Sequence, residues 1–355
     1  MNWKLIKKDY MLMLKNPLTY LSIFAMVVIL FMTVSPYLNL YGNLRVEGEE
    51  IVYSDDADIM DGYIPTSENE RWEYVSTKME TVLVNDYGMS QEDAEKQLDE
   101  VRDSDRTIQE IRQYFIDKYD LIGFASVWEE CGYKKADATE MQRYLDTVFQ
   151  EDTYTDYFAR KYADYLGISS ILFTMIVFSI LLMRDMRKNI YSFIHTKPIS
   201  GCSYVLGKYF TGISFVIYTI VVLTWIADIA VLNVGNSYGY PTNWGDIWRS
   251  IFSFDLPGIL LTGCIMFFIS ILFKNIIPAV PAMFLYFMYA NIGTINAGGE
   301  YHYQIKPGAV FVRFPQMFTE TEIPSGILGN QIFLLIMAVI LLIVSIRIWE
   351  RRRDA

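Results

Sequence analysis

Histidine and cysteine are scarce in this sequence of 355 residues. It contains two histidines, His195 and His302, and three cysteines, Cys131, Cys202 and Cys264. No Cys-x-x-Cys or His-Glu-x-x-His spacing occurs, so we expect no metal site built from these residues. The topology inferred below places no two cysteines in one compartment outside the bilayer, which excludes an internal disulfide. We interpret Cys131 as a buried, small apolar residue.

A nucleotide-binding motif is also missing. The nearest candidate, Gly201–Lys208, has five residues between its glycines where a P-loop has four, and Tyr209 replaces the Ser or Thr that binds magnesium. Carboxylates are nearly absent from the long apolar runs described next, so we expect no enzyme active site there. We therefore predict a non-catalytic chain that itself binds no cofactor.

Long apolar runs, in contrast, are abundant. Each is about 20 residues long, the length that a helix needs to cross ~30 Å of hydrocarbon. The runs are unbroken rather than alternating, and they therefore predict helices rather than barrel strands. The sequence predicts an all-α polytopic membrane protein with six transmembrane helices: Leu18–Leu38, Gly167–Met183, Leu206–Val231, Leu256–Phe273, Ile276–Asn296 and Ile332–Ile348.

Lysine and arginine are distributed unevenly around these runs. Fourteen lie in the N-terminal stretch, the second-to-third and fourth-to-fifth connections and the C-terminal end. The two short connections on the other side carry only Arg249, Lys306 and Arg313. Because basic short loops stay on the cytoplasmic side of a membrane, we expect both termini of this multi-pass protein to be cytoplasmic.

Acidic residues are concentrated between the first two runs. Tyr41–Tyr165 holds 31 of the 41 Asp and Glu residues and 13 of the 30 Lys and Arg residues, so its charge is −18 and that of the remainder is +7. Helical periods such as Trp72, Val75 and Met79 predict that this acidic extracellular domain is mostly helical. An acidic exterior and a basic interior argue against nucleic acid as a partner and fit contact with anionic membrane lipids.

These observations divide the chain into five parts. We predict a cytoplasmic interfacial helix at 1–17, the first transmembrane helix at 18–40, the extracellular domain at 41–165, transmembrane helices two to six at 166–348, and a cytoplasmic tail at 349–355.

Local signals add detail to the extracellular domain. Ser90, with Asp93 three residues later, predicts a helix start, and Ser104 or Asp105 is predicted to cap the next helix. The segment Asp152–Tyr165 is predicted to run directly into the second span.

Two acidic residues lie in or beside the apolar runs. Asp228 is close to the outer end of the third run, where it could face a water-filled path or, in the blander interpretation, reach the aqueous boundary. Asp255 starts the fourth run, and we interpret it as a helix-end residue.

The connection Arg184–Lys208 carries an apolar stripe. Met186, Ile190, Phe193 and Ile194 have the spacing of one helical face, and Lys197-Pro198 ends the pattern. A short cytoplasmic helix of this kind could lie on lipid headgroups or dock into a groove on a soluble partner.

A local motif and the overall plan together resemble the permease subunits of bacterial type-2 ABC exporters. The motif is Ile194-His195-Thr196-Lys197-Pro198-Ile199-Ser200 followed by Tyr204-Val205-Leu206-Gly207-Lys208. The plan is a basic interfacial helix, a domain after the first span, and six spans in all. The size of that domain departs from many relatives, which have small external loops.

The resemblance implies a bacterial cell-membrane protein that works with other chains. It implies a separate ATPase subunit, in two copies, that binds ATP and Mg²⁺, and a second permease subunit, identical or homologous. It implies that the helix near 185–197 is the coupling helix that contacts the ATPase through Met186, Ile190, Phe193, Ile194 and His195. It also implies a substrate path near the second and fifth spans, for which the candidates, with Asp228 added, are Ser169, Phe173, Phe287, Tyr289 and Asn291.

The leading hypothesis is thus an exporter of an amphipathic substrate such as a peptide antibiotic, a drug or a lipid. A receptor whose extracellular domain binds a ligand is the alternative, although the chain has little cytoplasmic sequence for signal output. An ion-driven secondary transporter is a third class; the sequence shows neither the internal repeats nor the buried mid-membrane charges expected for it.

Overall fold

The chain forms two compact units. The computed structural model describes residues 3–104, 106–196, 199–295 and 301–353. The membrane unit comprises Met1–Leu38 and Glu151–Ala355, and the inserted unit comprises Asn39–Gln150. The acidic domain predicted at 41–165 therefore ends earlier than expected, because residues from Tyr154 onward belong to a long helix of the membrane unit.

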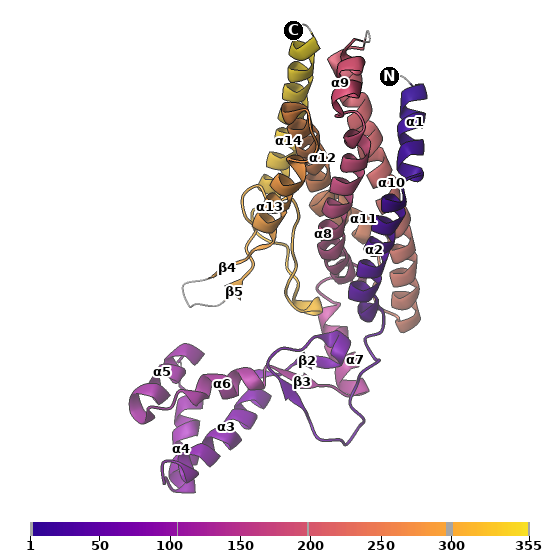
Figure 1. Ribbon diagram of the computed structural model, residues 1–355. Helices are drawn as coiled ribbons and strands as arrows, with labels where there is room; N and C mark the ends of the chain where they lie inside the picture. Colours follow the sequence, from indigo (N-terminus) through magenta and orange to yellow (C-terminus); the bar gives the residue numbers. More distant parts are fainter. Residues whose placement is uncertain (1–2, 105, 197–198, 296–300, 354–355) are drawn as a thin grey trace. The chain divides into compact units, whose positions relative to one another are not determined.

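The membrane unit is built almost entirely from helices (Figure 1). In chain order these are α1 (Trp3–Leu14), α2 (Pro17–Val34), α8 (Tyr154–Met183), α9 (Lys188–His195), α10 (Gly201–Tyr238), α11 (Gly245–Ser250), α12 (Leu256–Phe273), α13 (Ala279–Asn291) and α14 (Ile327–Arg353). Short elements complete the unit: the 3₁₀ turns η1 (Ser35–Leu38) and η4 (Phe318–Glu320), the π-helical turn η3 (Ile251–Asp255), and the paired strands β4 (Thr294–Ile295) and β5 (Tyr301–His302).

Five helical segments among the described residues are long and apolar enough to cross a membrane. They are Pro17–Leu38, Tyr154–Met183, Gly201–Tyr238, Gly245–Phe273 and Ile327–Arg352. The chain is accordingly an all-α, multi-pass membrane protein. The sixth predicted span, Ile276–Asn296, contains only the 13 residues of α13 in helical form. A helix of that length covers about 20 Å, which is short of the ~30 Å hydrocarbon core.

Local chemistry explains where the long helices begin and end. The Asn16 side chain accepts a hydrogen bond from Leu18 N, and Pro17 occupies the first turn of α2, where a missing N–H costs nothing. The Ser200 side chain caps α10 in the same way, and Gly239 ends that helix in the left-handed conformation. The segment Asp152–Tyr165 does continue into the second span, as predicted, because α8 is continuous from Tyr154.

Helix α8 lies at the centre of the membrane unit. Most of its side chains are buried, and α2, α10, α11 and α12 pack against it. The Phe178 ring fits where α10 and α12 carry glycine: a Cβ added at Gly212 would lie 2.9 Å from Phe178 Cζ, and one added at Gly263 would lie 2.8 Å from it. These glycines allow three helices to meet around one aromatic ring.

The connection between β5 and α14 is folded into the protein interior. Ala309–Phe314 is almost entirely buried although it is not helical. The Asn330 side chain holds its start: Gly308 N donates to Asn330 Oδ1 at 2.7 Å, and Asn330 Nδ2 donates to Ala309 O at 2.9 Å. Non-helical backbone is tolerated at membrane depth only where it is satisfied and covered by protein in this manner.

The inserted unit combines five helices with a small sheet. Its helices are α3 (Glu68–Asn85), α4 (Gln91–Arg102), α5 (Ile108–Tyr119), α6 (Gly123–Glu130) and α7 (Ala138–Val148), with the 3₁₀ turn η2 (Ile59–Asp61). The strands β1 (Tyr53–Ser54), β2 (Tyr63–Pro65) and β3 (Tyr133–Lys135) pair antiparallel in the order β1-β3-β2. The sequence pattern did not reveal this sheet, because strands of two or three residues show no periodicity.

The core of the inserted unit contains most of the predicted apolar stripes. Trp72, Val75, Met79 and Phe115 are buried together, and Cys131 belongs to the same cluster with no exposed surface. Cys131 is therefore the buried apolar residue that was predicted.

The helix caps of the inserted unit only partly match the prediction. The Ser90 side chain does accept from Asp93 N and starts α4. The cap of α5 is Thr107, in a reciprocal pair with Glu110, and not Ser104; Asp105 lies outside the described residues.

Candidate functional site

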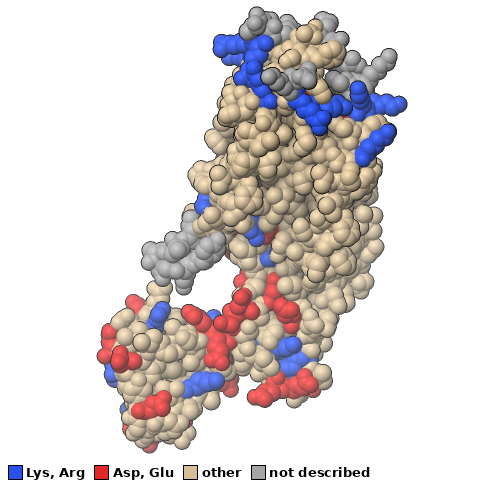
Figure 2. Space-filling view, in the orientation of Figure 1, with Lys and Arg blue, Asp and Glu red and all other residues tan. Residues whose placement is uncertain are grey.

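Helix α9 lies at the end of the membrane unit that carries both chain termini, here called the terminal end (Figure 1). Lys and Arg side chains gather there, above a body whose visible surface is largely uncharged (Figure 2). Arg187 has an extended backbone and starts the helix, so the chain leaves α8, turns and then forms the eight residues of α9. A short helix thus connects two long apolar helices at the basic end.

One side of α9 packs on a stack of aromatic rings. The Tyr191 and His195 rings are 4.2 Å apart, and His195 lies 4.0 Å from Trp349 of α14. Trp349 in turn stacks on Tyr204 of α10 at 3.8 Å. His195 Nδ1 is also 2.8 Å from Tyr191 O. The stack fixes α9 to the base of α10 and to the end of α14.

The other side of α9 faces outward. The Phe193 side chain is 60% exposed, and Ile190 and Ile194 are partly exposed. Of the five residues implied as partner contacts, Phe193 is therefore the most accessible. Met186 precedes α9 and is buried, and His195 belongs to the aromatic stack, so these two residues support the helix instead of forming its outer face.

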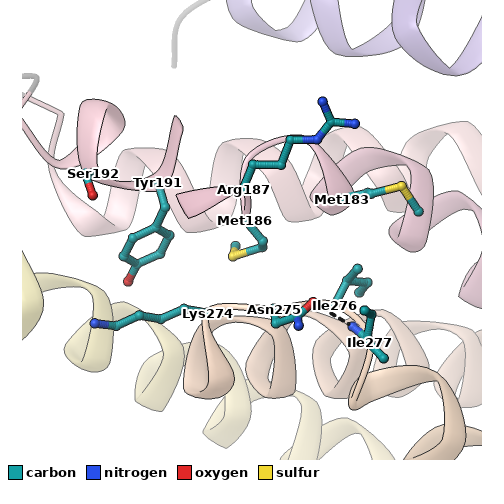
Figure 3. Close-up of a pocket in the computed structure, with 9 residues that line it drawn as sticks. All are labelled: Met183, Met186, Arg187, Tyr191, Ser192, Lys274, Asn275, Ile276 and Ile277. Carbon is teal, nitrogen blue, oxygen red and sulfur yellow. Dashed lines mark hydrogen bonds between the residues drawn. The ribbon is translucent and has the colours of Figure 1, made fainter. Parts of the chain in front are cut away.

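A pocket of about 640 Å³ separates the start of α9 from the turn between α12 and α13 (Figure 3). Met186 and Tyr191 point across it toward the turn, whereas Arg187 points away. Lys274 adopts a left-handed conformation at the end of α12, and its ammonium lies 5.7 Å from the Tyr191 ring. The pocket lies between two short connections at the terminal end, the one from α8 to α9 and the turn between α12 and α13, which are distant in the sequence.

A buried ion network lies behind α9. Lys208 Nζ is 2.9 Å from Asp9 Oδ1 and 2.7 Å from Asp185 Oδ2, and all three side chains are at most 5% exposed. Arg184 is 3.6 Å from Asp9, and the Tyr204 hydroxyl donates to Asp185 at 3.2 Å. Burial raises the pKa of the Asp9 carboxyl, and the Lys208 ammonium acts in the opposite direction. The network joins α1, the end of α8 and α10 directly beside the first residues of the α9 connection.

This network was not predicted from the sequence. Lys208 was counted only as one of many positive charges, although a lysine two residues inside an apolar run was a usable signal. Asp9 is the one acidic residue in a basic N-terminal stretch. Its pairing with Lys208 spans almost 200 positions, and local patterns carry no information about such a contact.

The residues implied as a substrate path lie in three places. Ser169 and Phe173 are buried on α8, where the Ser169 hydroxyl donates to Tyr165 O at 2.8 Å and the Phe173 ring lies 6.3 Å from Phe215. Both are thus engaged in helix packing.

Three further path candidates are on α13 and contact the connection that follows it. Phe287 is buried. The Tyr289 hydroxyl donates to Pro307 O at 3.0 Å, and Asn291 Oδ1 accepts from Arg313 Nη1 at 2.5 Å.

Asp228 occupies the third place, near α11. It is 6% exposed and accepts a hydrogen bond from Trp248 Nε1 at 3.1 Å. Its carboxylate is therefore largely covered by protein.

Buried charges inside the spans correct the sequence-based expectation. Asp164 of α8 accepts hydrogen bonds from Arg313 and from Phe314 N. Asp255 is 1% exposed, and among the described residues neither of its carboxylate oxygens has a hydrogen-bond partner. It is the last residue of η3 and directly precedes α12, within the continuous helical segment Gly245–Phe273. This carboxylate lies inside the span because α11 and η3 extend the predicted fourth span by more than two turns.

Comparisons with known proteins gave no match. No family model, no curated protein and no solved structure matches this chain. Among the described residues, no group of three or more His, Cys, Asp or Glu side chains is placed to hold a metal ion.

Proposed function

We propose that this chain is the transmembrane permease subunit of an ABC transporter that exports an amphipathic substrate, with ATP hydrolysed on a separate subunit. The observation that carries the proposal is α9. It is a short helix between two long apolar helices, packed on one side against rings of α10 and α14 and exposed at Phe193 on the other. Such a helix has the form needed to fill a groove on a soluble partner.

The packing of α9 suits the transmission of force. A partner that pushed on Phe193 would act on a helix whose inner residue, His195, packs on Trp349, which in turn stacks on Tyr204. Because packed aromatic rings leave little free space, movement of α9 would be passed to α10 and α14.

The energy source must be another chain under this proposal. The only P-loop-like stretch, Gly201–Lys208, forms the first two turns of α10, and its lysine is already paired with Asp9 and Asp185. A phosphate-binding loop needs free backbone N–H groups and a free lysine. ATP and Mg²⁺ are therefore assigned to the partner ATPase, in two copies, with a second permease completing the complex.

Six crossings, with both termini cytoplasmic, are also part of the proposal. Both termini lie at the same end of the membrane unit (Figure 1), which supports an even number of passes. Five are complete helices, so the sixth pass falls to α13 and the buried connection around Ala309–Phe314. The basic terminal end would then face the cytoplasm, and the acidic inserted unit would be extracellular.

Ion coupling is a weaker explanation, although the structure removes one argument against it. Asp164 and Asp255 are buried charges of the kind that the sequence was expected to lack. Asp164 is, however, paired with Arg313. The ATP-driven proposal therefore rests on α9 and not on the absence of buried acids.

A receptor function is the second candidate, supported by the inserted unit. This unit has its own core and an open groove of about 650 Å³ beside Tyr53, Glu70 and Tyr74. This candidate would be favoured by a ligand that binds the full-length protein and has no effect on ATP turnover. Binding of that ligand should be lost when Tyr74 is replaced by Ala.

Purification from the native membrane tests the leading proposal. We expect a P-loop ATPase to remain bound in near-stoichiometric amount after mild detergent, as measured by mass spectrometry. The variant Phe193→Asp should lose it while keeping the wild-type melting temperature. Repeated purification of intact protein without any ATPase would contradict the proposal.

A further inference from the structure

A second pocket lies on the membrane unit, away from α9. It has a volume of about 410 Å³ and is bounded by the segment around η3 and by the first turns of α14. This volume is within the ~300–1,000 Å³ range of small-molecule sites. Its walls are mostly apolar, with contributions from Phe252, Pro257, Ile327, Leu328, Ile332 and Leu335.

Arg249 provides hydrogen-bond donors to this pocket. It is 64% exposed, and its Nη2 donates to Asp156 Oδ1 at 2.7 Å. A guanidinium has five N–H donors, so most of those on Arg249 remain for an oxyanion such as a phosphate. Arg160 also lines the pocket, but it is buried, and its Nη1 donates to Thr321 O and its Nη2 to Asp152 and Asp156. Arg160 therefore holds the wall of the pocket together.

One buried side chain provides an unmatched acceptor. Gln331 is 6% exposed, and its Nε2 donates to Phe254 O at 3.1 Å. Its Oε1 is buried and has no partner among the described residues. Leaving such an atom unpaired is unfavourable, so a ligand that carries an O–H or N–H donor would be favoured.

The apolar wall continues beyond the pocket. Leu328 is 71% exposed, and Ile332, Ile336 and Val339 extend the exposed apolar surface along α14. In a membrane-spanning helix this surface faces hydrocarbon. A ligand with a polar head in the pocket could therefore lay its chains along α14.

We propose that this pocket binds a phospholipid of the surrounding bilayer whose headgroup carries both a phosphate and a hydroxyl or amine donor. The phosphate pairs with Arg249, the donor pairs with Gln331 Oε1, and the acyl chains cover Leu328 and Ile332. Free phosphate would leave the apolar wall uncovered, and a neutral hydrocarbon would leave the polar atoms unpaired. The assignment is independent of the proposed transport function.

Short-chain lipids test the assignment on the full-length protein in an uncharged detergent. Binding is measured for dihexanoyl phosphatidylglycerol and dihexanoyl phosphatidylethanolamine, which carry donors, and for the phosphatidylcholine analogue, which carries none. We expect the first two to bind at least fivefold more tightly. Arg249→Gln should weaken binding of all three lipids about tenfold, the lower end of the effect of losing a hydrogen bond to a charged group. Gln331→Leu should abolish the difference between the headgroups.

The matched control is Lys306→Gln, which removes a basic residue that contacts Tyr289 outside the pocket and should leave binding unchanged. Leu328→Trp, at an exposed position, narrows the pocket without removing a buried partner and should also weaken binding. Equal affinity for all three headgroups, no effect of Arg249→Gln and Leu328→Trp, or full competition by inorganic phosphate at the same concentration would overturn the assignment.

Discussion

Trp349 stacks on Tyr204, with ring centroids 3.8 Å apart and an interplanar angle of 16°. Both residues are buried, and Trp349 also contacts the His195 ring of α9. One side chain near the end of the chain therefore joins three helices at the terminal end. This contact links α9, through His195, to α10 and α14.

Replacing Trp349 with Ala should loosen α9. We expect a loss of about 3–5 kcal/mol, as for other buried aromatic truncations. Hydrogen exchange should become faster across Lys188–His195, as measured by mass spectrometry. Trp225→Ala is the matched control, because Trp225 is 57% exposed. Unchanged exchange in α9 after Trp349→Ala would show that the stack does not hold the helix.

Replacing Lys208 with Met should destabilise the membrane unit. The change leaves Asp9 and Asp185 buried without their shared cation, and breaking a buried ion pair in this way costs about 3–5 kcal/mol. The melting temperature should fall clearly, and adding Asp9→Asn and Asp185→Asn should restore part of it. Lys15→Met, at an exposed position, should have little effect. A neutral result for Lys208→Met would mean that water solvates the two carboxylates.

Replacement by Ala should have opposite effects on stability at two glycines, Gly258 and Gly207. A Cβ at Gly258 would lie 1.6 Å from Val310 O, so Gly258→Ala must displace the buried connection from α12. We expect a loss of about 3 kcal/mol, at the upper end of overpacking effects. No atom lies within 4 Å of a Cβ added at Gly207, so Gly207→Ala in α10 should be neutral or stabilise by up to about 1 kcal/mol. Melting temperatures of the two variants compare them directly, and equal values would contradict the close approach at Gly258.

Glu140 should make the inserted unit sensitive to acid. Burial raises the pKa of its carboxyl, but hydrogen bonds from Lys134 and Asp137 N, together with the Lys134 charge, outweigh this effect and lower the pKa to about 2. The folded-state pKa lies below the ordinary value of 4.5, so the stabilisation is complete above about pH 5 and is lost as the pH falls toward 2.

The test compares melting temperatures at pH 7 and pH 3.5. Glu140→Gln should lower the value at pH 7 and reduce the difference between the two pH values. Glu100→Gln, an exposed residue on α4, should change neither. If both variants respond to acid in the same way, Glu140 is not the group responsible.

The sequence predicted the helices better than the contacts between them. Long apolar runs and basic flanks identify the five spans that are complete helices, because length and charge are local properties. The brevity of α13 was missed, since the residues after Asn291 remain apolar although they leave the helix. The pairs Asp164–Arg313 and Asp9–Lys208 were also missed, because each joins residues about 150 or more positions apart. For α9, the pattern indicated the outward Phe193, whereas the role of His195 in the stack depends on Trp349, far along the chain.

A photo-crosslinking amino acid at position 193, in the native membrane, shows whether the outer side of α9 contacts a separate ATPase. Position 210 is the control, because Phe210 is also an exposed apolar residue, on α10. We expect a crosslink to a P-loop ATPase from position 193 and none from position 210. Crosslinks from position 193 to lipid alone would instead show that α9 lies on the membrane surface and does not contact an ATPase.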